Sequence, residues 1–186
     1  YLIDNNYLRG EYRKKNEEYF NSYENGSLNI DEFSKFSLKP FVGLNMSEIS
    51  IILEDFYNQV LSPNFNDVIL SLIDDHRKKK DIIILASATN SLIVSYVAKK
   101  LSIKKFVSSE VLFEDKICTG NVKKPYALGF GKLELVTNLM TKNNFKFEDA
   151  YFYSDSINDD PLLSKVAFPI AVNPDTNLEK KCSIMN

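Results

Sequence analysis

The chain has 186 residues, of which 44% are hydrophobic and 26% are charged. This composition can support a packed core, so it excludes a disordered or low-complexity protein. The formal net charge is only −2, whereas a dedicated nucleic-acid-binding protein usually carries a basic surplus. The densest basic run, Arg77-Lys78-Lys79-Lys80, is therefore interpreted as a solvated helix end.

The cysteines and the apolar runs indicate the cellular compartment and the partners to expect. Two cysteines, Cys118 and Cys182, are too few for a disulfide framework or a zinc site. Two free thiols suit a reducing compartment, so we expect a cytoplasmic protein. The longest apolar run covers only residues 82–86, far too short to cross a membrane. We expect neither a membrane nor a nucleic acid as a partner.

The first third of the chain has a helical pattern. Residues 1–64 contain no strand-like apolar run, and their spacing predicts three helices, at residues 7–23, 31–39 and 47–61. Asn29 with Glu32 three residues later predicts a capping box for the second helix, and Ser47 is the expected cap of the third. We expect residues 1–64 to form a small helical domain.

The remaining residues, 65–186, alternate helical segments with short buried strands. The expected strands lie at residues 82–86, 105–107, 150–153 and 168–172, and the expected helices at residues 67–80, 92–101 and 131–141. This alternation favours an α/β fold with a Rossmann-like parallel sheet and right-handed crossovers. Turns at Glu114-Asp115 and Thr119-Gly120 predict a β-hairpin over residues 111–122.

Polar residues gather where ligands bind in such a sheet, which is at the carboxyl ends of its strands. Ser87-Ala88-Thr89-Asn90 follows one strand, an acidic stretch from Ser154 to Asp160 follows another, and Gly131-Lys132 opens a helix between them. Hydroxyl and free N–H groups hold phosphate, carboxylates hold Mg²⁺, and a lysine offsets their mutual repulsion. Singly, each stretch could be a turn, a solvated loop or a surface lysine. Together they predict a site for phosphate and Mg²⁺.

These motifs, in this order, resemble the haloacid dehalogenase superfamily of phosphohydrolases, and most closely its phosphoserine phosphatase-like subfamily with its histidinol-phosphatase-like members. The second, third and fourth family motifs resemble residues 83–90, Gly131-Lys132 and residues 153–163, and the T-G-x-V flap signature resembles residues 119–122. The resemblance implies a Rossmann-like core at residues 65–186, with a hairpin flap near residues 111–122. It also implies that residues 1–64 form a helical cap over the site.

The resemblance further implies roles for individual residues. Ser87, Lys132 and Asp159 would be catalytic. Ser87, the backbone of Ala88 and Lys132 would bind phosphate, while Asp155 would be the metal ligand and Asp159 would pair with Lys132. The expected reaction is Mg²⁺-dependent hydrolysis of a small phosphorylated metabolite through an aspartyl-phosphate intermediate.

The cap sequence bears on the substrate. In the phosphoserine phosphatases, the cap helix after a G-x-L-N stretch carries an arginine that binds the substrate carboxylate. Here Gly26-Ser27-Leu28-Asn29 is followed by Lys35 and no arginine. A bidentate carboxylate clamp is therefore absent from this stretch, and we expect a phosphate ester without a carboxylate, such as histidinol phosphate.

The chain departs from the family at its first motif, D-x-D-x-[TV] after a strand, which supplies the nucleophile and the general acid. Leu2-Ile3-Asp4-Asn5-Asn6 has no second carboxylate two residues after Asp4, and the chain begins with Tyr1. We expect the central strand of the sheet to lie on a missing N-terminal piece, and the 186 residues alone to be inactive. A phosphotransferase of the same family and a non-catalytic binding protein remain as alternatives.

Overall fold

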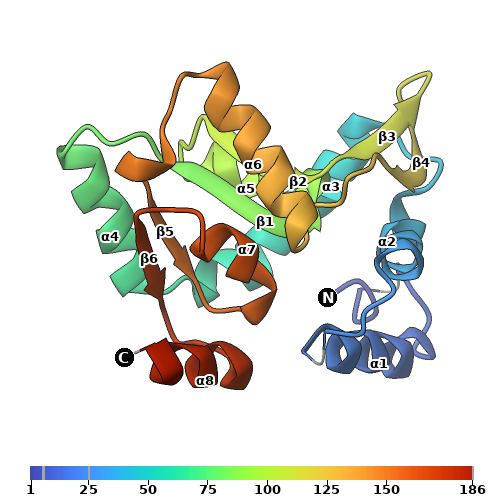
Figure 1. Ribbon diagram of the computed structural model, residues 1–186. Coiled ribbons are helices and arrows are strands. Elements are labelled where there is room, and N and C mark those ends of the chain that lie inside the picture. Colours follow the sequence, from blue (N-terminus) through green and yellow to red (C-terminus); the bar gives the residue numbers. More distant parts are fainter. Residues whose placement is uncertain (6, 25, 186) are drawn as a thin grey trace.

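Two parallel strand pairs lie at the centre of the molecule in the computed structural model, which describes residues 1–5, 7–24 and 26–185 (Figure 1). Strand β1 (Ile84–Asn90) pairs with β2 (Lys105–Ser109), and β5 (Tyr151–Ser154) pairs with β6 (Phe168–Ala171). Within the described ranges no backbone ladder joins β1 to β5, so each of these two strands is paired along one edge only. The predicted α/β class is confirmed.

Strand β1 differs from the prediction in its position. It begins at Ile84 and continues to Asn90, so the stretch predicted to follow the strand belongs to its end. The pairing with β2 shifts between Ala86 and Asn90, because Ala86 lies opposite Val107 while Asn90 lies opposite Ser109. Residues 87–89 therefore fall in an irregular part of the ladder, where backbone N–H groups can turn toward a ligand.

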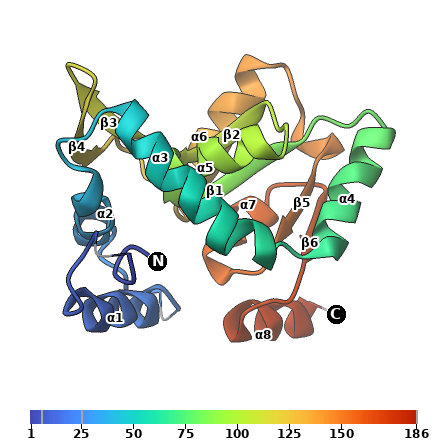
Figure 2. The same cartoon turned by 180° about the vertical axis from the view of Figure 1, so that it is seen from behind.

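Helices cover both faces of the β1–β2 pair. Helix α6 (Phe130–Lys142) lies on one face, while α5 (Ser91–Lys100) and α3 (Met46–Phe56) lie on the other (Figures 1 and 2). The remaining helices of the core are α4 (Asp67–Lys78), α7 (Asp160–Leu163) and α8 (Thr176–Met185). Both faces of this strand pair are thus shielded, as parallel sheets require.

A hydrophobic cluster joins the two strand pairs. Its buried members come from β2, α6, α7 and the loop before α6, and they are Val107, Ala127, Val136, Met140 and Leu162. Ile84 of β1 and Phe152 of β5 pack against the same cluster. Side-chain packing therefore holds β1 and β5 in one core, although no backbone hydrogen bonds connect them.

Helices α1 (Tyr12–Glu24) and α2 (Ile30–Leu38), the cap helices hereafter, lie to one side of the strands (Figure 1). Asn29 caps α2, since its side chain accepts the Glu32 N–H, but the described hydrogen bonds do not include the return bond from Glu32 that a capping box needs. The predicted cap of α3 is wrong: Asn45 caps that helix, and Glu48 completes the capping box with it. An amide oxygen at residue 45 reaches both the residue 47 and 48 N–H groups, which leaves Ser47 inside the first turn.

A second hydrophobic cluster contains residues from both sides of the predicted domain boundary at residue 64. Buried side chains from the first third pack with side chains of the later part; they are Leu38, Phe41, Ile49, Ile52 and Leu53 with Leu92, Val111 and Cys118. The backbone of the first third is also hydrogen-bonded to the hairpin. The Gly43 N–H donates to the Cys118 carbonyl, and the Cys118 N–H donates to the Leu44 carbonyl. The boundary at residue 64 stays a prediction.

The predicted hairpin is confirmed as β3 (Val111–Glu114) and antiparallel β4 (Ile117–Val122). The Thr119 hydroxyl donates to the Leu112 carbonyl and accepts the Asn121 N–H. Gly120 has φ = +75°, and a Cβ there would collide with the Val42 side chain. The T-G pair thus has a local conformational reason in this hairpin.

The state of the cysteines and the character of the helices are also defined in the described part of the chain. Both cysteines are free, with Cys118 buried and Cys182 partly exposed. Among the described helices, none combines the length and the apolarity that crossing a bilayer demands.

Candidate phosphate and metal site

The centre of the candidate site is a buried ion pair. Lys132, in the first turn of α6, pairs with Asp159, which ends a 3₁₀ turn (Ile157–Asp159) after β5. The two side chains are 5% and 9% exposed. The second carboxylate oxygen of Asp159 accepts the Ser154 hydroxyl at 2.7 Å. The predicted pairing of Lys132 with Asp159 is confirmed, and the buried charges are compensated within the protein.

The acidic loop, residues 154–160, is held in shape from one side by Asp175. One Asp175 carboxylate oxygen accepts the Ile157 N–H at 2.7 Å, and the other accepts the N–H groups of Asn177 and Leu178 at 3.0 and 2.8 Å. Burial raises the pKa of Asp175, but these backbone N–H groups outweigh it, so the pKa lies below its usual value. Asp175 therefore has a structural role that joins the acidic loop to the start of α8.

Asp155, the predicted metal ligand, follows β5 directly and is exposed. Its carbonyl accepts the Asp175 N–H at 2.6 Å, which fixes its backbone. The carboxylate, by contrast, has no hydrogen-bond partner among the side chains that the structure describes, so it is free to meet a ligand. Its role as a metal ligand stays a prediction.

Ser87 and Ala88 lie in the middle of β1, where its pairing with β2 is irregular, and both are half-buried. The Ser87 hydroxyl oxygen accepts the Thr89 N–H at 3.2 Å. The Ala88 carbonyl accepts the Ser109 hydroxyl at 3.0 Å, and the same hydroxyl accepts the Ala127 N–H at 3.1 Å. Ser109, which the sequence did not single out, thereby ties the end of β1 to the loop before α6. Phosphate binding by Ser87 and Ala88 stays a prediction.

The structure thus brings Lys132 and Asp159 into contact, and it places Ser87 in the middle of β1 and Asp155 directly after β5. Among the described residues, neither a hydrogen bond nor an ion pair joins Ser87 or the Asp155 carboxylate to Lys132 or Asp159. Asp4 is elsewhere: its carboxylate accepts the Arg13 guanidinium at 2.7 Å, and that hydrogen bond lowers the pKa of Asp4. Asp4 thus pairs with Arg13 on the exposed surface and is not part of this site.

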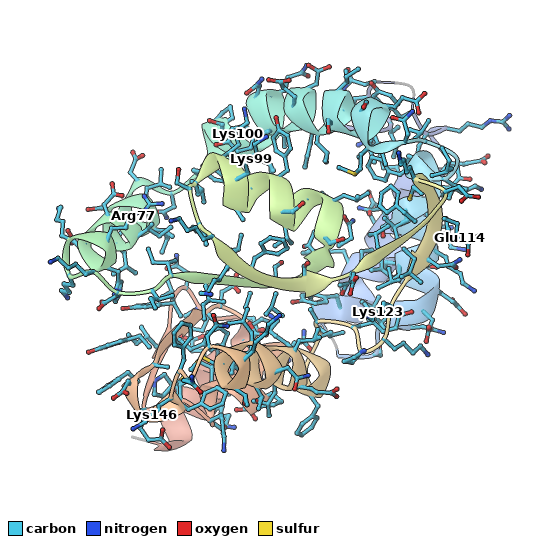
Figure 3. The ribbon with its side chains drawn as sticks, turned by 90° about the horizontal axis from the view of Figure 1, so that it is seen from above. Arg77, Lys99, Lys100, Glu114, Lys123 and Lys146 are labelled. Atoms are coloured by element: carbon cyan, nitrogen blue, oxygen red, sulfur yellow. The ribbon has the colours of Figure 1, made fainter. Side chains whose placement is uncertain are left out.

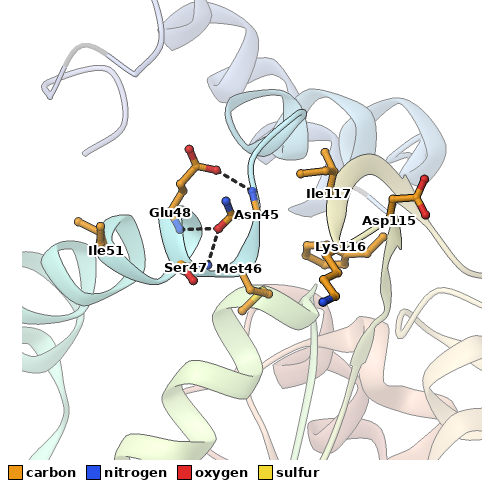
Figure 4. Close-up of a pocket in the computed structure, with 9 residues that line it drawn as sticks. Asn45, Met46, Ser47, Glu48, Ile51, Asp115, Lys116 and Ile117 are labelled. Atoms are coloured by element: carbon orange, nitrogen blue, oxygen red, sulfur yellow. Dashed lines mark hydrogen bonds between the residues drawn. The ribbon is translucent and has the colours of Figure 1, made fainter.

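A depression of about 680 Å³ lies away from these residues, between the start of α3 and the turn of the hairpin (Figure 4). Its walls include Met46, Ile51 and Ile117, and none of the predicted site residues lines it. The Glu48 carboxylate at its rim is already occupied by the Asn45 N–H at 2.8 Å. We therefore place the chemistry at the strand ends.

The basic run begins in the last turn of α4, and its first two residues form ion pairs within that helix. Arg77 pairs with Asp74 at 2.8 Å, and Lys78 pairs with Asp75 at 2.9 Å. Figure 3 shows Arg77 on the side of the molecule where Lys99 and Lys100 lie at the end of α5, far from Glu114 of the hairpin. These pairs fit the interpretation of the run as a solvated helix end.

Comparisons with known proteins place this chain in a family. The profile of the haloacid dehalogenase-like hydrolases matches residues 2–164, so the chain belongs to that family. Over 175 residues the chain is 31% identical to a protein of Neisseria meningitidis named histidinol-phosphatase, covering 92% of this chain and 79% of that protein.

Solved structures agree on the fold. A Bordetella pertussis protein of unknown function superposes with a TM-score of 0.89 at 25% identity, covering 99% of this chain and 85% of that one. A phosphoserine phosphatase structure described as a phospho-aspartyl intermediate analogue superposes with a TM-score of 0.66 at 14% identity, covering 90% and 77%. The family and fold expected from the motifs are therefore confirmed, and the relatives support a phosphate-ester hydrolase.

Proposed function

We propose that this chain provides the phosphate- and metal-binding part of an Mg²⁺-dependent phosphomonoesterase. The observation that carries the proposal is the buried Lys132–Asp159 pair beside the carboxyl ends of the parallel strands. Burying an ion pair costs desolvation free energy, so a buried pair is weak evidence for a stabilising role. Phosphoryl transfer, by contrast, needs a fixed cation that offsets the charge of the phosphate.

Each residue has a role in this proposal. The Ser87 hydroxyl and the Ala88 N–H would donate to phosphate oxygens, and the Lys132 ammonium would stabilise the charge that spreads over them. Asp159 would hold the Lys132 side chain in place, because both of its carboxylate oxygens are already engaged, one with Lys132 and one with Ser154. Asp159 is therefore proposed to act by positioning Lys132.

The metal needs more ligands than these residues offer. Asp155 supplies a carboxylate, the type of ligand that Mg²⁺ prefers. No group of three or more His, Cys, Asp or Glu side chains that could hold a metal occurs among residues 1–5, 7–24 and 26–185. The donor chemistry fits, whereas the number of donors does not. We propose Asp155 as the one protein ligand from this chain, with other ligands coming from phosphate, water and a further segment.

The nucleophile also requires a further segment. The 186 residues contain no D-x-D sequence, and β1 and β5 each pair along only one edge. We propose that a parallel strand carrying D-x-D-x-[TV] fits between β1 and β5. In that arrangement the first aspartate attacks phosphorus, the second protonates the leaving alkoxide, and water then hydrolyses the aspartyl-phosphate.

The proposed substrate is a small phosphate ester that lacks a carboxylate. Within the described part of the cap helices the arginine is Arg13, and its guanidinium already pairs with Asp4. Helix α2 carries Lys35, which cannot form the bidentate fork of an arginine. The similarity to the Neisseria histidinol-phosphatase supports histidinol phosphate as the first candidate.

The test compares the 186-residue chain with the same chain extended by a D-x-D-x-[TV] strand ahead of Tyr1, each with Mg²⁺. We expect hydrolysis only by the extended chain, with kcat/KM for histidinol phosphate about tenfold or more above that for phosphoserine, because phosphoserine finds no carboxylate clamp. Product analysis with added alcohols separates a hydrolase from a phosphotransferase. An extended chain that folds and binds phosphate without turnover would favour the non-catalytic alternative.

A further inference from the structure

A hydrogen bond joins the cap helices to the core near the candidate site. The Tyr126 hydroxyl, in the linking loop of residues 123–129, donates to the Asp31 carboxylate of α2 at 2.6 Å. The Lys124 ammonium lies 3.4 Å from the same carboxylate oxygen. Ninety-five residues separate Asp31 from Tyr126 in the sequence, so the contact exists only because the cap helices lie against the core.

The ionisation of the two groups favours this bond. Burial and the Asp31 carboxylate together raise the pKa of Tyr126 to about 12, so the phenol keeps its proton at neutral pH. The hydrogen bond from Tyr126, with a smaller effect of Lys124, lowers the pKa of Asp31. A neutral phenol therefore meets a carboxylate, which makes the bond charge-assisted.

The backbone at residues 126–127 contacts two segments of the proposed phosphate site, which are the start of α6 and, through Ser109, β1. Gly131, next to Lys132, lies so close that a Cβ at residue 131 would collide with the Tyr126 carbonyl. The adjacent Ala127 is fully buried, and its N–H donates to the Ser109 hydroxyl that also binds the end of β1. Movement of Tyr126 would therefore press on the start of α6 and on the end of β1.

We infer that Tyr126 and Asp31 form a latch that keeps the cap helices against the linking loop, and that Tyr126 is a positioning residue for Lys132. Closing the latch fixes the loop against Gly131 and so sets the first turn of α6, from which Lys132 extends. The catalytic role of Lys132 rests on the proposed function, whereas the latch itself is a property of the fold.

Hydrogen exchange of the 186-residue chain tests the latch without any activity. In Tyr126→Phe we expect about fivefold faster exchange of the α2 amides, since one charge-assisted bond at a partly exposed position is lost. Amides at residues 130–134 should accelerate with them, while α5 and α8 should not. Tyr96→Phe is the matched control, because the Tyr96 hydroxyl has no hydrogen-bond partner among the described residues.

Three further variants decide the mechanism. Asp31→Ala should accelerate exchange at least as much as Tyr126→Phe, because it removes the Lys124 pair as well as the Tyr126 bond. The double variant should match Asp31→Ala alone, since the Tyr126 bond is then already lost. Asp31→Asn keeps an acceptor and should lie between them and the wild type. Gly131→Ala should loosen α2 from the opposite end, as coupling is reciprocal. Additive effects, unchanged α2 exchange, or equal acceleration in α5 would each overturn the latch, whether or not the protein proves to be a phosphatase.

Discussion

Replacing Lys132 with alanine should lower the free energy of unfolding by about 3–5 kcal/mol, because the Asp159 carboxylate would remain buried without its cation. In a domain of this size such a loss lowers Tm by about 10 °C. Chemical denaturation and thermal unfolding of the 186-residue chain both measure it. This is a large effect for a single residue, since a whole domain is stable by only about 5–15 kcal/mol.

The control lies in the same helix. Lys142 is exposed in the last turn of α6, so Lys142→Ala should change stability by less than about 0.5 kcal/mol. The double variant Lys132→Met with Asp159→Leu removes both charges and should recover most of the loss. If Lys132→Ala were as mild as Lys142→Ala, the ion pair would not be the buried feature on which the proposed site depends.

Replacing Asp155 with asparagine should abolish Mg²⁺-dependent turnover in the chain extended by the D-x-D-x-[TV] strand, with a loss of about 10³-fold or more in kcat. The amide keeps the shape of the side chain but loses the negative charge that a hard cation needs. Stability should hardly change, because Asp155 is exposed and its fold contact is made by its carbonyl. Kinetics at varied Mg²⁺ and a melting curve measure the two effects separately.

Asp149→Asn provides the comparison, since Asp149 is another exposed aspartate just before β5 and no role is assigned to it. It should retain wild-type turnover. Substantial Mg²⁺-dependent activity in Asp155→Asn would remove this residue from the metal site.

The sequence predicted the parts of the fold that have a local or periodic signal. The strand before Asp155, the T-G turn of the hairpin and the Lys132–Asp159 pairing all follow from short patterns in their chain order, although β5 is buried only at Ser154. The predicted strand at residues 82–86 lies too early in the chain compared with β1. The stretch from Ser87 to Asn90 lacks the apolar pattern of a strand, and it belongs to β1 only because it pairs with β2.

The residues that sequence reasoning missed act across long separations. Asp175 closes onto Ile157 from 18 residues away, and Ser109 binds the Ala88 carbonyl from 21 residues away. Asp31 and Tyr126 are farther apart still. None of these contacts imposes a period on the sequence, because each is a single hydrogen bond created by packing of distant segments. For Asp175 a signal was available, because the A-V-N-P-D stretch of residues 171–175 resembles the tail of the fourth family motif.

The most direct test of the central claim is a crystal structure of the strand-extended chain grown with Mg²⁺ and inorganic phosphate. We expect a phosphate ion with oxygens about 2.7–3.2 Å from the Ser87 hydroxyl and the Lys132 ammonium, and Mg²⁺ about 2.0–2.1 Å from an Asp155 carboxylate oxygen. The added strand should pair with both β1 and β5. Phosphate bound elsewhere, with Asp155 facing solvent and β1 and β5 still unpaired with the added strand, would contradict the account.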